Sequence, residues 1–294
     1  MSLTHDTSKL AMGVVLLAPV TYEIGPFRHR ADRSSHDRLL ANAQRLRGDI
    51  YFRDGAISPT ALTDDGRYVQ RADDESWHLL IIDTEEKLQG CVRYCVHPSD
   101  VLFADLHASH CSMLQSEPWG SSVRRAIQSD IDRARLLGFS YIEVGGWAIS
   151  EKIRCTTEVL RMVLMIYAFG QLMGGAYGLS NVTTRHHSAS ILRRLGGASL
   201  IDKGKDVPPY HDPDYGCQME FLTFDSTKPN PRYAGWIDDC HYVLSNLVAI
   251  TPGCEDIQAG SLLQLNHAIS ENASHGLEDE PSLSGPETVK TSSN

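Results

Sequence analysis

The sequence predicts a mixed α/β fold, with one central mixed sheet and helices on both of its faces. From about residue 121 onwards, helix-like and strand-like segments alternate, which is typical of parallel strands joined by helices. Before that point, two strand-like segments are separated only by a short turn, which predicts an antiparallel pair. The chain has 294 residues, of which 41% are hydrophobic, and this is enough for a sizeable core.

The first part of the chain is expected to form a strand, a helix and two further strands. The apolar, β-branched run 14–25 begins the sheet. Apolar residues at helical spacing predict a helix over 34–52, with Ser and Asp as capping candidates at its start. Residues 54–76 are polar and contain Gly and Pro, so they form a long loop of the kind that is often functional. Strands over 77–83 and 87–98 follow.

The middle of the chain alternates between helices and strands. An amphipathic pattern that ends at a glycine predicts a helix over 121–138. After the strand 141–150, the segment 156–173 is apolar on most faces, so its helix must be buried. A strand over 176–184 and a short helix over 186–197, which ends in two glycines, follow.

The last part of the chain is expected to complete the domain and then to become disordered. Residues 217–225 read as a final strand and 232–250 as one more helix. From about residue 271 the chain is rich in Ser, Glu, Pro and Gly without periodicity, which predicts a disordered acidic tail. We therefore expect a single domain over 1–250 and an extension over 251–294.

The charge distribution excludes one class of partner and favours another. A net charge of −10 argues against a general nucleic-acid binder, which needs a broad basic face. Residues 121–200 nevertheless carry ten Lys and Arg against five Asp and Glu. This basic window indicates either a local site for an anionic ligand or partner, or a solvated helix face.

Cysteine usage and hydropathy favour a cytoplasmic protein. The seven cysteines include no Cys-x-x-Cys pair, and an odd, unpatterned set is typical of a reducing compartment. The apolar run 11–20 is short for a membrane span and lacks the charged start of a signal sequence, so no stable membrane insertion is expected. The motifs HASHC (107–111) and HDPDYGC (211–217) lack a recognised ligand spacing, and we expect no metal site.

Two adjacent glycines interrupt the strand 141–150, whose sequence is YIEVGGWAIS. Gly145 and Gly146 weaken a strand, so they mark a bulge or a place where a ligand approaches the backbone closely. A plain bulge or close helix packing is the alternative. No Gly-x-Gly-x-x-Gly follows a strand, and no Walker-type loop is present, so neither dinucleotide nor nucleotide binding is favoured.

Taken together, the segments from 121 to about 225 resemble the GNAT acyltransferase fold. The stretch SASILRRLGG (188–197) is similar to the helix that carries a signature of that superfamily. Within it, RLRGDIYFRDG (45–55), the segment 73–98 and IEVGGWAIS (142–150) resemble acyl-homoserine-lactone synthases and bacterial N-acyl amino acid synthases. The resemblance implies a GNAT-like mixed sheet that is splayed between its fourth and fifth strands.

Two departures from the family pattern bear on substrate choice. Gly146 stands where the homoserine-lactone synthases carry an Arg after the strand Glu, which puts their particular acceptor in doubt. In RCTTEV (154–159), Thr157 and Val159 occupy positions where acetyltransferases have the glycines that approach the pyrophosphate of coenzyme A. This favours a donor with a single phosphate, namely phosphopantetheine on an acyl carrier protein.

The resemblance also implies the site residues. Glu143 is the expected base, and backbone N–H groups near Gly146 and Trp147 would hold the oxyanion. The alternatives are a structural Glu143 paired with Arg93 and a core Trp147. The residues expected to bind the donor are Gly145, Ala148, Arg154, Thr156 and Arg185. Those expected to bind the acceptor are Arg93, Asp73 and Asp74, although the two aspartates are alternatively solvated loop charges.

These residues predict an N-acyltransferase that moves a fatty acyl group from an acyl carrier protein to the amine of an amino acid or similar small acceptor. The expected donor substrate is acyl-phosphopantetheine or acyl-CoA, with no permanently bound cofactor. Arg185, Arg193 and Arg194 would dock the carrier protein. Two alternatives stay open: an acetyl-CoA-dependent N-acetyltransferase and a non-catalytic module that binds a carrier protein.

Overall fold

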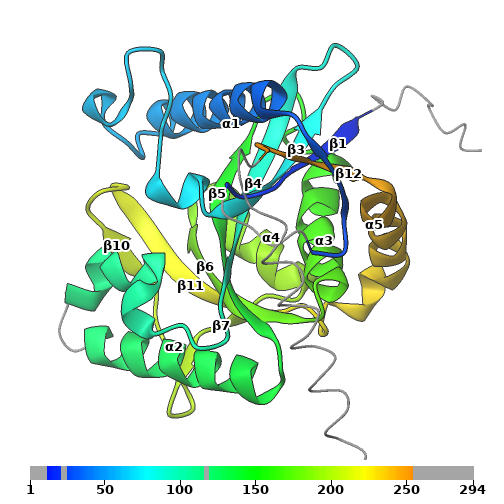
Figure 1. Ribbon diagram of the computed structural model, residues 1–294. Helices are drawn as coiled ribbons and strands as arrows, with labels where there is room; N and C mark the ends of the chain where they lie inside the picture. The colour runs from blue at the N-terminus through cyan, green and yellow to red at the C-terminus, as the bar shows by residue number, and fades with distance from the viewer. Residues whose placement is uncertain (1–11, 21–24, 116–118, 254–294) are drawn as a thin grey trace, which may run out of the picture. The chain divides into compact units, whose positions relative to one another are not determined.

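The fold, given by a computed structural model, is described for residues 12–20, 25–115 and 119–253. It is a mixed α/β fold with a large central sheet, as the sequence predicts (Figure 1). The helices are α1 (Arg33–Arg53), α2 (Trp119–Leu136), α3 (Thr157–Leu172), α4 (Ser188–Leu195) and α5 (Ala234–Asn246). The longer strands are β1 (Gly13–Leu17), β3 (Ser76–Ile82), β4 (Leu88–His97), β5 (Ser140–Ile149), β6 (Ala176–Thr183) and β11 (Cys217–Asp225). The shorter strands are β2 (Arg28–Ala31), β7 (Ala198–Ser199), β8 (Ile201–Asp202), β9 (Lys205–Asp206), β10 (Tyr210–Asp212) and β12 (Val248–Thr251).

The sheet is mixed because hairpins and crossovers both contribute to it. Its order is β10-β11-β6-β5-β4-β3-β1-β12-β2, and β7 pairs with β11 beside this path. The pairs β3·β4 and β4·β5 are antiparallel, whereas β5·β6, β1·β12 and β12·β2 are parallel. The parallel pair β5·β6 is joined by α3, which gives the expected strand–helix–strand unit.

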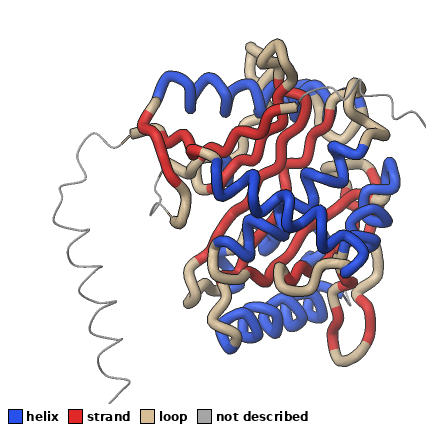
Figure 2. The backbone as a smooth tube through the Cα atoms, turned by 90° about the vertical axis from the view of Figure 1, so that its right-hand side faces the viewer, coloured by secondary structure: helices blue, strands red, loops and turns tan. Residues whose placement is uncertain are grey.

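Helices cover both faces of the sheet, and each face has its own apolar core. On one face, α3 packs with α4 and α5 in a cluster that includes Trp77, Tyr94 and Phe169. Figure 2 views the molecule from this side and shows helices in front of the strands. On the other face, α1 packs on β4 and β5, while α2 packs on β5 and β6. The apolar pattern of α3 arises because nine consecutive residues, 162–170, are buried.

One predicted element is wrong at its end. The helix expected over 232–250 stops at Asn246, and Val248–Thr251 forms strand β12 between β1 and β2. Val248 and Ile250 are β-branched, and the pairing places Ala249 and Ile250 in the buried interior. Strand β2 was not predicted, because its sequence RHRA is polar and all four of its residues are exposed. The acidic tail predicted from residue 271 lies outside the described residues.

The sheet is splayed between its fourth and fifth predicted strands, which are β5 and β6. Their parallel pairing runs from Ser140 to Glu143 on β5 and ends opposite Leu179 on β6, although both strands continue. The closed part is tight, since a Cβ on Gly178 would lie 2.0 Å from the Ile142 carbonyl oxygen. Beyond it, the Ser180 hydroxyl donates to the Val144 carbonyl at 2.8 Å in place of a backbone ladder.

Within residues 12–20, 25–115 and 119–253, no helix combines the length and the apolar character that crossing a bilayer requires.

Candidate active site

A β-bulge lies in β5 immediately beyond the point where β5 leaves β6. Cys91 of β4 pairs with Ala148 and Arg93 pairs with Gly145, so Gly146 and Trp147 together face a single residue of β4. Gly146 has φ +63°, a left-handed conformation that side chains with a Cβ rarely adopt. The double glycine of the sequence therefore marks a bulge, as predicted, and Gly146 is the residue whose torsion requires it.

The bulge decides which way the following side chains point. Trp147 packs against the cluster under α3, while Ala148 is buried in the cluster under α1. Without the extra residue, alternation along the strand would place each of them on the opposite face. Ala148, expected at the donor, is thus 2% exposed among apolar side chains, and Trp147 takes the core position that was its alternative role.

A buried ion network lies against the bulge on the α1 face. Asp73 accepts from Arg47 at 2.7 and 2.6 Å and from Arg93 at 3.0 Å, and Arg93 also donates to the Gln70 side chain. A Cβ on Gly146 would lie 3.0 Å from Arg47 Nη1. Burial opposes the charge of Asp73, but its hydrogen bonds and ion pairs with the arginines hold its pKa well below the usual range.

The network leaves no free oxygen on Asp73. Besides the two arginines, its carboxylate accepts from the Gln44 side chain and from the Gln70 backbone N–H. Asp73 therefore positions the arginines in this structure and is not available to an ammonium group. Asp74, the other predicted aspartate, is exposed, and its carboxylate is not among the groups that bind Arg47 or Arg93. Arg93 and Asp73 are brought together, whereas Asp74 is not.

The predicted base, Glu143, lies on the same face of β5 and is held on three sides. Its carboxylate accepts from His97 Nε2 at 2.8 Å, from the His107 N–H at 2.9 Å and from the Ala108 N–H at 2.7 Å. Burial would raise the pKa of Glu143, but the hydrogen bond and charge of His97 and the two backbone donors lower it. The alternative role of Glu143 paired it with Arg93, but its partner in the structure is His97.

Beside Glu143, a thiol and two imidazoles share one buried cluster. Cys95 Sγ lies 3.7 Å from His107 Nε2, and His107 belongs to a short 3-10 helix, η4 (His107–His110), that covers the cluster. Burial opposes ionisation of Cys95, yet hydrogen bonds with His107 and His97 lower its pKa to about 6. Burial likewise opposes the charge of His97, but Cys95 and Glu143 raise its pKa to about 10.

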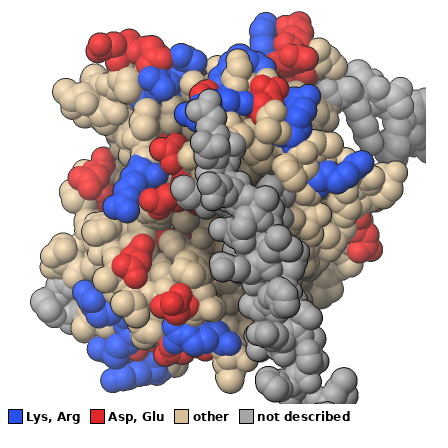
Figure 3. All heavy atoms as spheres, viewed as in Figure 1, with Lys and Arg blue, Asp and Glu red and all other residues tan. Residues whose placement is uncertain are grey.

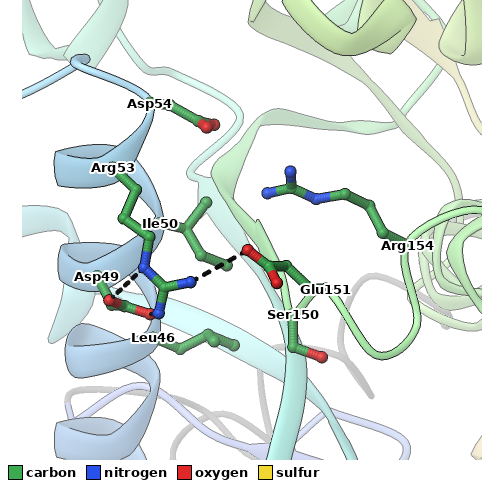
Figure 4. Close-up of a pocket in the computed structure, with 8 residues that line it drawn as sticks. All are labelled: Leu46, Asp49, Ile50, Arg53, Asp54, Ser150, Glu151 and Arg154. Atoms are coloured by element: carbon green, nitrogen blue, oxygen red, sulfur yellow. Dashed lines mark hydrogen bonds and ion pairs between the residues drawn. The ribbon is translucent and has the colours of Figure 1, made fainter.

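A pocket lies where β5 ends and α1 passes over it. It is lined by Leu46, Asp49, Ile50, Arg53, Asp54, Ser150, Glu151 and Arg154, and it holds about 460 Å³ of empty space, part of it open to solvent. Figure 4 shows the Arg154 guanidinium pointing from the β5–α3 connection toward α1. Arg53 is engaged by Asp49 and Glu151. Arg154 thus lines this pocket together with three carboxylates, and its expected contact with a donor phosphate stays a prediction.

The other two residues expected at the donor have structural contacts. Thr156 is the N-cap of α3: its hydroxyl accepts from the Glu158 N–H at 3.3 Å. Arg185 donates to the carbonyl oxygens of Asp54 and Gly216, and the neighbouring His186 lies 3.3 Å from the Asp54 carboxylate. The two contacts with Asp54 tie the segment just before α4 to the end of α1.

The basic window is not a single surface. On α2, Arg125 pairs with Asp202, Arg124 stacks on Phe103 and Arg133 stacks on Tyr177. Figure 3 shows Lys and Arg gathered at the bottom of the view, over α2, with carboxylates among them. On α4, the Arg193 guanidinium is held by both oxygens of Glu220, at 2.7 and 2.6 Å. Arg194 is exposed and lines a shallow depression with His187 and Ser190.

Sequence reasoning missed Arg47, His97 and Cys95. Arg47 lies on the apolar face of α1, between Ala43 and Ile50 at helical spacing, and an Arg within such a stripe is a signal for a buried ion pair. Cys95 and His97 alternate along β4 and so share a face. The spacing of Cys95 and His97 could not have revealed His107, because His107 lies on η4 and comes close to them only in the folded protein. Among the described residues, no group of three or more His, Cys, Asp or Glu is placed to hold a metal ion.

Comparison with solved structures finds similarity to synthases of the branch that the motifs resemble. The CoA-dependent acyl-homoserine lactone synthase BjaI, bound to SAM and isopentyl-CoA, matches with a TM-score of 0.48 and 16% identity over 86% of this chain and 100% of its own. The acyl-homoserine-lactone synthase LasI matches at 0.45 and 11%, over 73% of this chain and 90% of its own. FeeM, an N-acyl amino acid synthase from uncultured soil microbes, matches at 0.41 and 13%, over 74% and 93%.

Sequence comparison adds no closer relative. No protein-family model matches the chain, and no curated protein matches it.

Proposed function

We propose that the protein is an N-acyltransferase that moves a fatty acyl group from acyl carrier protein to the amine of an amino acid or a similar small acceptor. One observation carries the proposal. β5 separates from β6 after Glu143, and a bulge at Gly146 follows within three residues. An opened sheet beside a residue without a side chain gives a thioester-bearing arm both a place to lie and backbone donors near its carbonyl.

The donor arm would enter at the pocket below α1 and run along the opened edge of β5. Arg154 would hold the pantetheine phosphate, close to the start of α3, where exposed N–H groups favour an anion. Backbone N–H groups near Gly146 and Trp147 would then stabilise the negative charge that develops on the thioester oxygen. Arg194 on α4 would meet an acidic face of the carrier protein.

The charge of the pocket supports a carrier-protein donor over coenzyme A. Two cations, Arg53 and Arg154, face three carboxylates, from Asp49, Asp54 and Glu151. Because Arg53 is already paired with two of these acids, Arg154 is the cation of this pocket that can pair with a phosphate, and one cation suits a single phosphodiester. The several phosphates of coenzyme A would be repelled at such a surface.

The acceptor would lie on the α1 face, over Gly145 and Arg93. The buried network of Arg47, Asp73 and Arg93 carries two positive charges and one negative charge, so it attracts an anionic group. The Nη2 of Arg93 faces Gly145, 3.8 Å from the place where a Cβ would stand. This arrangement suits the carboxylate of an amino acid, whose amine would then point along β5 toward Glu143.

Glu143 would take the amine proton through its remaining acceptor position. A carboxylate has about four lone-pair sites, and three of these are used by His97 and by two backbone N–H groups. The remaining position, on Oε1, can hold a water or the ammonium itself. As the nitrogen attacks the carbonyl carbon, the proton passes to this oxygen and the pantetheine thiolate leaves.

A comparison of donors tests the proposal. The full chain is mixed with a panel of amino acids and either a long-chain acyl carrier protein, the matching acyl-CoA or acetyl-CoA, and both the N-acyl product and the free thiol are measured. We expect product with the carrier-protein donor, at a higher kcat/KM than with either CoA thioester. Preference for acetyl-CoA would favour the N-acetyltransferase, and binding of carrier protein without turnover of any thioester would favour the non-catalytic module.

A further inference from the structure

The buried thiol of Cys95 lies close to the opened edge of the sheet. Cys95 on β4 pairs with Glu143 on β5, and Glu143 in turn pairs with Leu179, the last residue of β6 in the parallel ladder. The three residues therefore stand in one row across the sheet, at the position where the two parallel strands separate. A thiol in this row is one strand away from the place proposed for the donor thioester.

The groups around Cys95 are those that activate a thiol. His107 faces the sulfur from η4, His97 lies two residues along the same strand, and Glu143 binds His97 from β5. Glu75 is a further charged group on this side, with Oε2 4.0 Å from His107 Nε2, and the charge of Arg93 also acts on His107. Hydrogen bonds with the two imidazoles favour the thiolate form of Cys95. Glu143 keeps His97 positively charged, and this charge also stabilises the thiolate.

Cys91 shows that the activation is specific to one position. It lies four residues earlier on β4, points to the same face and is buried, like Cys95. Its thiol meets the carbonyl oxygens of Ala43 and Gly146 and no imidazole, and burial raises its pKa to about 11. The two cysteines thus differ in their neighbours and not in their exposure.

The cluster reaches the protein surface at His107 and Glu75. The side chain of Cys95 is almost fully covered, but that of His107 is 31% exposed and that of Glu75 is 43% exposed. The cover is η4, which Glu143 holds through the backbone N–H groups of His107 and Ala108. Movement of this short segment would uncover the sulfur without disturbing the sheet.

We propose that Cys95 is an acyl-accepting nucleophile, with His107 as its proton carrier, a role that rests on the thioester donor of the proposed function. Cys95 Sγ bonds to the thioester carbonyl carbon, the bond from that carbon to the pantetheine sulfur breaks, and the leaving thiolate takes the proton of His107. The acceptor amine then attacks the new thioester. The C–N bond forms, the C–Sγ bond breaks, and the amine proton passes to His107, which in this two-step route takes the place that Glu143 has in direct transfer from pantetheine.

Rapid quenching with peptide mapping tests this role. The full chain is mixed with a hexanoyl thioester of N-acetylcysteamine, with and without amino acids, and the acylated residue and the amide product are followed separately. We expect acyl groups on Cys95 in the wild type and in Cys91→Ala, and their loss in Cys95→Ala and Cys95→Ser. Changing His107 to Gln should slow the acylation by about 10²-fold.

The two readouts separate this inference from the proposed function. Amide product with no acyl group on Cys95, and at an unchanged rate in Cys95→Ser, would overturn the inference and leave the function standing. Acylated Cys95 without amide product from any amino acid, both with this thioester and with a long-chain acyl carrier protein, would support the inference and refute the function. Acylation of Cys91 and Cys95 at equal rates would show nonspecific thioester exchange and would also overturn the inference.

Discussion

Adding one methyl group to Gly146 should damage the protein far more than adding the same group to Gly145. Gly146 has φ +63°, and a left-handed conformation destabilises an L-residue by about 1–2 kcal/mol. Its new Cβ would lie 3.0 Å from Arg47 Nη1 and 3.2 Å from Arg93 Cβ. Arg47 is buried and held by two hydrogen bonds to Asp73, which oppose its movement away from the new methyl group. Overpacking of this kind adds about 1–3 kcal/mol.

We therefore expect Gly146→Ala to lower the free energy of unfolding by about 2–4 kcal/mol. Gly145→Ala is the matched control, because its Cβ would meet only Arg93 Nη2, at an ordinary 3.8 Å. Since alanine also restricts the unfolded chain, Gly145→Ala should stay within about 1 kcal/mol of the wild type. Urea denaturation of the three proteins measures both values. If the two variants differed by less than about 0.5 kcal/mol, which is the usual scatter of surface substitutions, the account of the bulge would be refuted.

Three further predictions concern charges. Asp73→Asn leaves the guanidinium groups of Arg47 and Arg93 buried without a counter-charge, so urea denaturation should show a loss of about 3–5 kcal/mol, and an equal loss in the exposed Asp74→Asn would contradict the network. Burial raises the pKa of Asp130 to about 7, so this group supports folding below pH 4 and loses that contribution as the pH rises to about 7. Asp130→Asn should flatten this dependence, and a stability–pH curve that keeps its slope would exclude the assignment. Arg154→Gln should raise KM for the carrier-protein donor and leave kcat unchanged; a fall in kcat alone would place Arg154 elsewhere.

The sequence predicts the sheet well where side-chain periodicity dominates. β3, β4, β5, β6 and β11 lie within a residue or two of their predicted positions, because apolar alternation and glycine stops mark them directly. β2 and β12 could not be recognised as strands from the same signals. β2 is exposed and polar, and β12 follows α5 after only one residue, so its apolar residues continue a helical pattern.

The candidate site was predictable only in part, for a similar physical reason. A strained backbone leaves a trace in the sequence, since only glycine suits the torsion of Gly146. Hydrogen-bond partners that come from distant segments leave no such trace in the sequence. The carboxylate of Glu143 is held by residues about 36 and 46 positions away, and Asp73 by an arginine 26 positions away. Such contacts follow from the packing of η4 and α1 on the sheet, which periodicity does not specify.

The parallel strand β12 has a consequence for the order of folding. It fills the space between β1 and β2, so two segments made near the start of synthesis stay unjoined until residues 248–251 have been translated. α1 follows β2 directly and shares contacts with β12. A nascent chain can thus assemble β3 to β6 early, while the border formed by β1, β12 and β2 closes last. This border of the sheet is therefore completed by residues that the ribosome delivers late.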